Sequence, residues 1–299
     1  MKLLGRTSIV AVMMLGTVLL QSAGDRWGLR LPWYLLHQLV LALIPMIWLL
    51  RRVLSPRGEV GALSFVATSA LFISASAIFE LIAIAHRYWW FSTAVDPLSG
   101  LHLGSVPLEE FLFYPLFLNL PILVFLWLES TVGGPGRLPD WPRVRVASRV
   151  LGLALLGLGV AVAIWGQLQR TPALDPALLP WRAPTGQWVY LSGPRQCGWT
   201  VVQLCGLGLT LSLLSTLWTR LPARALGLTL LCYFPFAMFI ELMACGRGWW
   251  VWNAQQVLGV FTWVLPIESY AMYLTGAVLP PLVLVWLRPL FPADRPGAG

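Results

Sequence analysis

The sequence contains few charged residues. They make up 11% of its 299 residues, whereas 58% of the residues are hydrophobic. A soluble globular chain carries about 25% charged residues. A chain with so little charge cannot cover a large water-facing surface, so the composition excludes an ordinary soluble domain. It indicates an integral membrane protein, whose surface faces membrane lipids.

Cysteine and histidine are also scarce. The four cysteines show no C-x-x-C spacing and lie in or beside apolar runs, so they are expected to be small buried residues rather than disulfides or ligands. The three histidines have no metal-ligand spacing, and the chain has neither a G-x-G-x-x-G fingerprint after a strand-like run nor a phosphate-binding loop. We therefore expect no metal and no nucleotide, flavin or other cofactor.

Long apolar runs account for most of the chain. About 20 apolar residues cross a bilayer core, and the sequence has eight candidate spans, near 7–23, 33–50, 61–85, 108–128, 149–167, 199–219, 224–245 and 266–287. The pattern predicts an all-α polytopic membrane protein with about eight transmembrane helices. The first run follows Lys2 and Arg6 and also resembles a signal peptide, whose cleavage would leave seven spans.

Arginine and lysine indicate the orientation. With eight spans, thirteen of these residues fall on one side of the membrane and seven on the other. The positive-inside rule then places both termini in the cytoplasm, for a protein of the cell membrane. The net charge of +8 is explained by topology, so we do not expect a nucleic-acid partner.

Two parts of the chain carry the same residues at similar spacing. The first contains Glu80, Arg87, Trp89-Trp90 and Pro107-Leu108-Glu109-Glu110, and the second contains Glu241, Arg247, Trp249-Trp250 and Pro266-Ile267-Glu268-Ser269. Tyr114 and Tyr273 each follow the first Glu of their motif by five residues. The repeat predicts two membrane modules, residues 1–130 and 149–299, joined by a Gly/Pro/Arg linker at 131–148.

The acids in these repeats call for an explanation. A charged side chain within a membrane span costs about 2.5 to 3.5 kcal/mol even on insertion scales. Pro107 and Pro266 suit the first turn of a helix, and a Glu that follows them faces the positive end of the helix dipole. Capping does not account for Glu80 and Glu241, which lie about twenty residues into their spans. We therefore expect the set to handle protons or bind a ligand.

The arginines suggest how roles divide among the acids. Arg87 follows Glu80 by seven residues and Arg247 follows Glu241 by six, so each arginine could approach its Glu along the helix and keep it charged. This assigns Glu80 and Glu241 to support or cation stabilisation. An acid without such a partner in hydrocarbon is more stable protonated. This assigns Glu109, Glu110 and Glu268 to proton donation or removal.

Aromatic residues accompany the acids and allow two interpretations. One is an interfacial belt. The other is a binding surface whose rings stabilise a cation. The aromatic residues expected to bind substrate are Trp89, Trp90, Phe113, Tyr114, Trp249, Trp250, Tyr270 and Tyr273.

The motifs at 107–113 and 266–270, each preceded by a Glu-bearing span and a Trp-rich loop, resemble the membrane-integral, flavin-free lycopene cyclase family in its tandem-fused form. The resemblance covers roughly 33–128 and 199–288 and implies cyclisation of carotenoid end groups with no net redox change. Ser269 departs from the family pattern, which has a second Glu there. The span near 149–167 is additional to a minimal pair of modules.

The expected reaction is an acid–base isomerisation in the membrane. Glu109 or Glu110 would protonate a ψ end group, the neighbouring alkene would close an ionone ring, and a carboxylate such as Glu268 would remove a proton. The expected partner is a lipophilic polyene from the bilayer; other carotenoid enzymes or a second copy of the chain remain open as protein partners. The alternatives are a proton-coupled transporter of a small molecule and a carotenoid hydratase that uses the same protonation.

Overall fold

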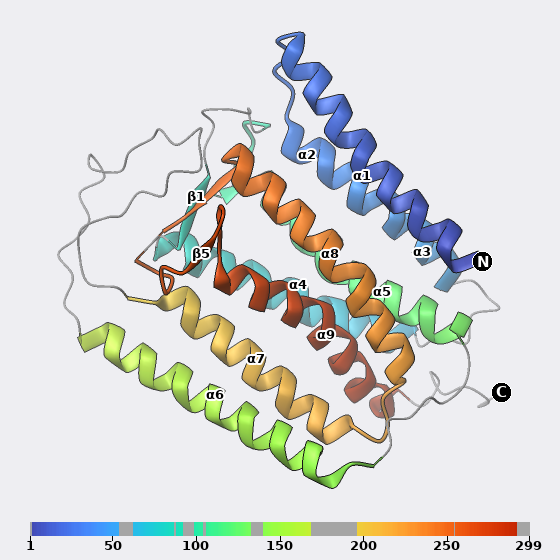
Figure 1. Ribbon diagram of the computed structural model, residues 1–299, viewed down its shortest axis with the longest axis vertical. Helices are drawn as coiled ribbons and strands as arrows, with labels where there is room; N and C mark the ends of the chain where they lie inside the picture. The colour runs from blue at the N-terminus through green and yellow to red at the C-terminus, as the bar shows by residue number, and fades with distance from the viewer. Residues whose placement is uncertain are drawn as a thin grey trace.

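The computed structural model describes residues 2–53, 62–86, 88–91, 99–103, 106–132, 140–168, 196–253 and 255–291. These residues form α1 (Lys2–Arg26), α2 (Trp33–His37), a π-helical stretch η1 (Gln38–Leu43), α3 (Ile44–Val53), α4 (Ala62–Ala85), α5 (Leu108–Val132), α6 (Pro142–Leu168), α7 (Gly198–Leu217), α8 (Ala223–Arg247), α9 (Ile267–Leu287) and a 3₁₀ turn η3 (Arg288–Leu290). Short strands connect some of the helices. Figure 1 shows the helices as one bundle, with α1 at one edge and α6 at the other.

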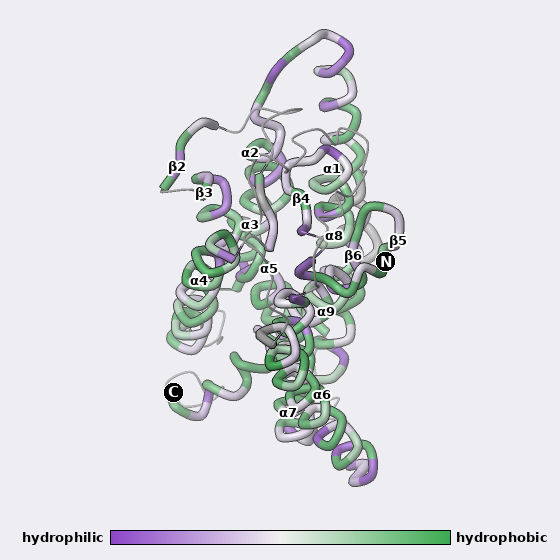
Figure 2. The backbone as a smooth tube through the Cα atoms, turned by 90° about the vertical axis from the view of Figure 1, so that its left-hand side faces the viewer, coloured by the Kyte–Doolittle hydropathy of each residue, from purple (hydrophilic) through white to green (hydrophobic). Residues whose placement is uncertain are grey.

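The predicted membrane fold is confirmed. Seven helices of the described residues are long and apolar enough to cross a bilayer, with α2, η1 and α3 acting as one span. Hydrophobic residues predominate along these helices (Figure 2). The segment predicted as the first span lies in helix α1, which is not one of these seven helices. The expected span at 149–167 lies in α6, which already begins at Pro142, so the end of the predicted linker 131–148 is helical.

The strands are short and belong to the ends of the helices. β1 (Trp89–Phe91) follows α4 and pairs antiparallel with β4 (Trp250–Trp252), which follows α8. The hairpin of β2 (His102–Leu103) and β3 (Val106–Pro107) precedes α5, and the hairpin of β5 (Phe261–Thr262) and β6 (Leu265–Pro266) precedes α9. We call the end of the bundle that carries β1 and β4 the sheet end (Figure 1).

The repeat in the sequence is a repeat in the structure. We refer to residues 33–132 as the first half and residues 198–290 as the second half. In the β1–β4 pair, Trp90 lies opposite Val251, with Trp89 opposite Trp252 and Phe91 opposite Trp250. This register is what a two-fold axis between equivalent strands produces. The two halves therefore meet face to face at this pair of strands.

The structural register between the repeats differs by one residue from the alignment of their Trp-Trp pairs. Trp89 and Trp250 both lie nine residues after their Glu, and each indole N–H donates to that Glu, at 3.2 Å to Glu80 and 3.4 Å to Glu241. Trp250 is thus the counterpart of Trp89. An alignment of the two Trp-Trp pairs places Trp249 opposite Trp89 instead, although Trp249 lies only eight residues after Glu241. A two-residue turn, Gly248 and Trp249, separates α8 from β4. That turn uses Gly248 with φ +69°, a conformation that favours glycine.

A proline inside α5 leaves a backbone carbonyl group that accepts a hydrogen bond from the other half. Pro121 has no N–H to donate to the carbonyl of Phe117, one turn earlier on α5. The hydroxyl of Tyr233, on α8, donates to that carbonyl instead, at 2.9 Å.

An ion pair also joins the two halves. Arg288 forms two hydrogen bonds, of 2.8 and 2.5 Å, with the carboxylate of Glu129. The core of the protein therefore lies between α5, α8 and α9.

The additional helix α6 packs closely against α7. A Cβ atom on Gly152 would lie 2.8 Å from the carbonyl oxygen of Gly208, and one on Gly208 would lie 2.7 Å from the carbonyl oxygen of Gly152. Only glycine allows such an approach of two helix backbones. α6 therefore extends the bundle on the side of the second half, away from the first.

Candidate active site

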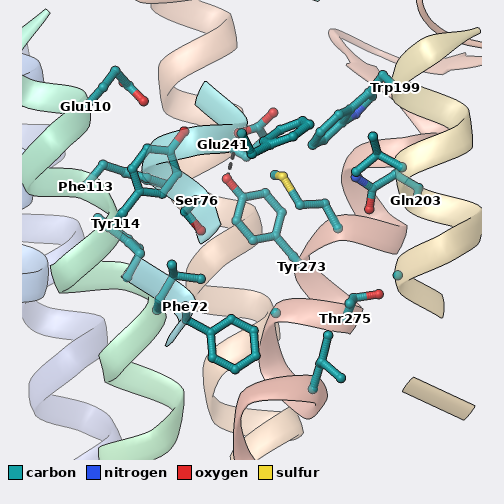
Figure 3. A pocket seen from close by; sticks show the side chains of 18 of the residues that line it. Phe72, Ser76, Glu110, Phe113, Tyr114, Trp199, Gln203, Glu241, Tyr273 and Thr275 are labelled. Atoms are coloured by element: carbon teal, nitrogen blue, oxygen red, sulfur yellow. Dashed lines mark hydrogen bonds between the residues drawn. The ribbon is translucent and has the colours of Figure 1, made fainter. Parts of the chain in front are cut away.

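A cavity of about 260 Å³ lies between the two halves. Its wall is mostly aromatic and aliphatic, with a few polar groups, and residues from both halves contribute to it (Figure 3). The lining residues come from α4 and β1 (Phe72, Ser76, Phe79, Trp89, Phe91), α5 (Glu110, Phe113, Tyr114, Phe117, Leu118), α7 (Trp199, Val202, Gln203, Gly206), α8 and β4 (Tyr233, Glu241, Trp250, Trp252) and α9 (Met272, Tyr273, Thr275, Gly276, Leu279, Pro280). Two carboxyl groups therefore line an otherwise largely apolar space.

Glu241 is the carboxyl group with the most hydrogen bonds. It is fully buried on α8, and five described residues donate hydrogen bonds to its oxygens. The donors are the hydroxyl of Tyr273 (2.7 Å), the hydroxyl of Ser269 (3.1 Å), the indoles of Trp252 (3.1 Å) and Trp250 (3.4 Å), and the thiol of Cys245 (3.6 Å). An indole can only donate, so this shell suits an acceptor such as a carboxylate.

Glu80 has the equivalent position in the first half and a smaller set of the same contacts. It accepts hydrogen bonds from the hydroxyl of Tyr114 and from the indole of Trp89. These donors are the counterparts of Tyr273 and Trp250. Glu80 is fully buried and, unlike Glu241, is not part of the cavity wall. A hydrogen bond between the mid-span Glu and a tyrosine of the following helix is therefore present in both halves.

Glu110 is the carboxyl group that reaches the cavity from the first half. It lies in the first turn of α5 and accepts a hydrogen bond through Oε1 from the hydroxyl of Tyr34, on α2. The ring of Tyr34 packs against Trp249 and Trp250, with centroids 5.3 and 5.4 Å apart. No described residue donates to the other oxygen, Oε2. That oxygen is free to interact with a ligand.

Glu109 and Glu268 make a different kind of contact. Each accepts a hydrogen bond from the backbone N–H ten residues earlier, Glu109 from Ser99 and Glu268 from Leu258, the latter at 2.7 Å. Glu268 also accepts from the hydroxyl of Thr200 at 2.5 Å. Both are buried, and neither is part of the cavity wall. The structure thus places these two predicted proton donors or acceptors where they secure the loop before α5 or α9.

The predicted aromatic residues divide into two groups. Trp89, Phe113, Tyr114, Trp250 and Tyr273 line the cavity, whereas Trp249 and Tyr270 do not. Trp249 packs against Tyr34 and His37, and the hydroxyl of Tyr270 accepts a hydrogen bond from Thr262. The side chain of Trp90 lies outside the described part of the chain.

The ion pair predicted between Arg247 and Glu241 is replaced by another in the structure. The guanidinium group of Arg247 forms hydrogen bonds of 2.8 and 3.1 Å with the carboxylate of Asp25, at the end of α1. Among the described residues, the hydrogen-bond donors to Glu241 do not include Arg247, so the expected support of Glu241 by this arginine is wrong. The side chain reaches the C-terminal end of α1 instead. Arg87 lies outside the described residues.

The two prolines lie just before their helices. Pro107 ends β3 and Pro266 ends β6, and the helices begin at Leu108 and Ile267. Pro266 is the N-cap residue of α9 and has an extended conformation, with ψ 150°. The prolines thus end the hairpin strands that carry the loops held by Glu109 and Glu268, rather than standing inside the first helical turn.

Several residues that line the cavity or contact its carboxyl groups are not evident from the sequence. Trp199 stacks on Trp252, with centroids 5.1 Å apart and planes 28° apart, and it also stacks on Phe79 at 5.7 Å. Trp199 and Gln203 come from α7 and Tyr34 comes from α2. These helices carry no motif of the repeat, so only the aromatic residues at the start of each span could have suggested them.

Among the described residues, no group of three or more His, Cys, Asp or Glu side chains is placed to hold a metal ion. The titratable groups that face the cavity are carboxyl and phenol groups. Such groups can donate and accept protons and can stabilise positive charge, and the surrounding aromatic rings can add to that stabilisation.

Comparison with known families gives one match. The model of the lycopene cyclase family matches residues 31–128 and 198–287, which together make up more than half of the chain. Neither the curated proteins nor the solved structures gave a match. The two matched segments begin and end close to the two halves of the structure, and the cavity lies between them. This multi-pass membrane protein therefore belongs to the lycopene cyclase family.

Proposed function

We propose that the protein cyclises the acyclic ψ end group of a lycopene-type carotenoid, with Glu110 as the proton donor and Glu241 as the proton acceptor. The observation that carries this proposal is the pair of carboxyl groups in a largely aromatic cavity between the two halves. Membership of the lycopene cyclase family supports the substrate class. The substrate enters from the bilayer.

The difference in hydrogen bonding supports the two roles. Tyr34 occupies Oε1 of Glu110 and leaves Oε2 to carry a proton towards the substrate. Glu241 faces five donors, two of them indoles that can only donate, so a negative charge on Glu241 is well accommodated. The protonated acid and the charged acceptor then belong to different halves.

The reaction proceeds without a change of oxidation state. The proton of Glu110 adds to the terminal alkene of the end group and leaves a tertiary carbocation. The neighbouring alkene forms a carbon–carbon bond to that cation, and the new cation loses a ring proton to Glu241. Proton exchange between the two carboxyl groups restores the starting state. The rings of Trp89, Trp250 and Phe113 line the space in which the cations form and stabilise them.

The test is the conversion of lycopene in a lycopene-accumulating host that expresses this chain. The native protein should give a cyclised product of unchanged mass. Glu110→Gln should abolish conversion, because the amide keeps the shape of the side chain and cannot supply the proton. The matched control is Glu109→Gln, one residue earlier: its amide oxygen still accepts the N–H of Ser99, so this variant should stay active. An inactive Glu109→Gln beside an active Glu110→Gln would reverse the assignment.

A hydratase is the second candidate, and one observation favours it. Gln203 lines the cavity, is only 6% exposed and makes no hydrogen bond with a described residue. Its amide could hold a water molecule that captures the cation. A hydrated product would carry the added mass of one water, and Gln203→Leu would shift the product towards the ring. A native product of unchanged mass favours cyclisation.

We also propose that both termini face the cytoplasm and that the sheet end faces the other side. Helix α1 begins, and helix α9 ends, at the end of the bundle opposite the sheet (Figure 1), and the positive-inside rule gives the direction. Topology reporters fused after Arg145 should score as cytoplasmic, and those fused after Gly100 should score as external. The reverse pattern would contradict the orientation.

A further inference from the structure

We infer that the polyene chain of the substrate leaves the reacting end group along α9, past Gly276, and not along the equivalent face of α5. This inference rests on the proposed function, because it extends the same cavity from the end group to the rest of the substrate. It names the part of the site that receives a long, unbranched apolar chain.

The cavity has two different ends. Glu110 lies in the first turn of α5, and Trp250 and Trp252 belong to the sheet end. Leu118 and Gly276 lie further along α5 and α9, about 10 to 12 Å from Glu110 and Ser269 at 1.5 Å per helical residue. The acids thus belong to the sheet end, and a mainly apolar part of the cavity extends from them towards the other end of the bundle.

The cavity is too small for a whole carotenoid. Its volume is about 260 Å³, below the range of about 300 to 1,000 Å³ of pockets that enclose a drug-sized ligand. It can hold one end group. The remaining chain, which is long enough to cross much of a bilayer core, has to continue beyond the cavity through an opening between helices.

The two halves differ at the position that decides where this opening lies. Phe117 and Gly276 are equivalent, because they follow Glu110 and Ser269 by seven residues each. Phe117 is 2% exposed and stacks on Phe113 and Phe236, with centroids 4.4 and 6.1 Å apart, so it fills the space beside α5. A Cβ atom built on Gly276 would meet no heavy atom within 4 Å. The space beside α9 is therefore open where its counterpart is filled.

Helix α7, which faces α9, also leaves room beside Gly276. Gly206, on α7, also lines the cavity, and its nearest neighbour for an added Cβ is Thr275, at 3.4 Å. Two glycines on facing helices, α7 and α9, thus widen the cavity at the same level. A flat polyene needs such a slot, because it has no bulky branches beyond its methyl groups.

The test compares substrates of two lengths in variants of Gly276. The substrates are lycopene and a shortened acyclic polyene that carries the same ψ end group but ends within the cavity. Gly276→Leu should lower the conversion of lycopene at least tenfold and leave the shortened substrate within about twofold of the native rate. The matched control is Gly227→Leu: Gly227 is an exposed glycine of α8 that also has no heavy atom within 4 Å of an added Cβ, so conversion of both substrates should be unchanged.

The outcomes separate this inference from the proposed function. If Gly276→Leu slows both substrates equally, or neither, the chain does not pass Gly276 and the inference is wrong. If the native protein converts neither substrate, the proposed function fails instead. Should Gly276→Leu not accumulate in the membrane, Gly276→Ala takes its place. Alanine favours the helix and meets no neighbour, so it should fold and show a smaller loss, confined to lycopene.

Discussion

The two halves of the protein share a set of contacts but use them differently. In both halves a mid-span Glu accepts hydrogen bonds from a tyrosine and a tryptophan at equivalent positions. In the first half, however, the carboxyl group in the cavity wall is Glu110, and in the second half it is Glu241. The duplicated framework therefore supports one asymmetric site, in which each half supplies one carboxyl group.

Ser269 explains how the difference arises. It occupies the position of Glu110, and its hydroxyl donates to Glu241. A carboxylate at this position would face Glu241 with a like charge, whereas the serine adds a fifth donor. The apparent loss of an acid from the second motif thus suits Glu241 to its proposed role as the acceptor.

The largest expected effect comes from the two equivalent mid-span acids. Glu241→Gln should lower turnover about 10²- to 10⁴-fold, the usual contribution of a general acid or base. Glu80→Gln should cost only about tenfold, equal to about 1.4 kcal/mol in the barrier, because Glu80 acts through Tyr114. Initial rates per amount of folded protein measure both effects. Equal losses would mean that the halves contribute equally.

A smaller effect, on stability, is expected for the acids that secure the loops. Glu268→Ala removes two hydrogen bonds, one from the N–H of Leu258 and one from the hydroxyl of Thr200, and should cost about 2 to 3 kcal/mol. Glu109→Ala removes only the one from the N–H of Ser99 and should cost about half as much. Thermal unfolding in detergent measures the difference. A greater loss for Glu109→Ala would show that its loop depends on it more.

Ser269 should matter less than its counterpart Glu110. Ser269→Ala removes one of five donors to Glu241, so it should lower stability by about 1 kcal/mol and change the rate only a few-fold. Ser269→Glu should alter the rate, or the ratio of one-ring to two-ring products, only modestly. Pigment analysis measures both. If Ser269→Ala abolished turnover, the serine itself would take part in proton transfer.

The smallest effect is expected at the ion pair between the halves. The side chains of Glu129 and Arg288 are 26% and 25% exposed, and a partly exposed pair contributes about 1 kcal/mol or less. Glu129→Arg should therefore lower the unfolding temperature slightly, and the exchange Glu129→Arg with Arg288→Glu should restore it. A double variant less stable than the single one would show that the two sites are not interchangeable.

The sequence predicted the apolar spans and the equivalence of the motif residues in the two halves. Apolar run length gives the spans, and the repeat gives the equivalent residues. The direction in which a side chain points could not be predicted in this way. Glu109 and Glu110 are adjacent and chemically identical, yet the helix turns one towards the loop and the other towards the cavity. The hydropathy pattern does not separate them, because both follow the same proline.

Contacts between distant segments were also beyond the sequence. Tyr34 and Trp199 come from spans that carry no repeated motif, and their contacts depend on how α2 and α7 pack against the centre of the bundle. The expected pair of Arg247 and Glu241 failed for a similar reason. The spacing allowed it, but α1 places Asp25 closer to the guanidinium group.

The ion pair between α5 and α9 also bears on how the halves recognise each other. Glu129 and Arg288 occupy equivalent positions: Glu129 comes 21 residues after the first residue of α5, and Arg288 comes 21 residues after the first residue of α9. Because equivalent residues of the two halves contact each other here, they meet at the local two-fold axis. Two copies of the first half would bring two carboxylates together there, and two copies of the second half would bring two guanidinium groups together. Opposite charges on the axis therefore favour a mixed pair of halves over either symmetric pair, by the modest energy of a partly exposed ion pair.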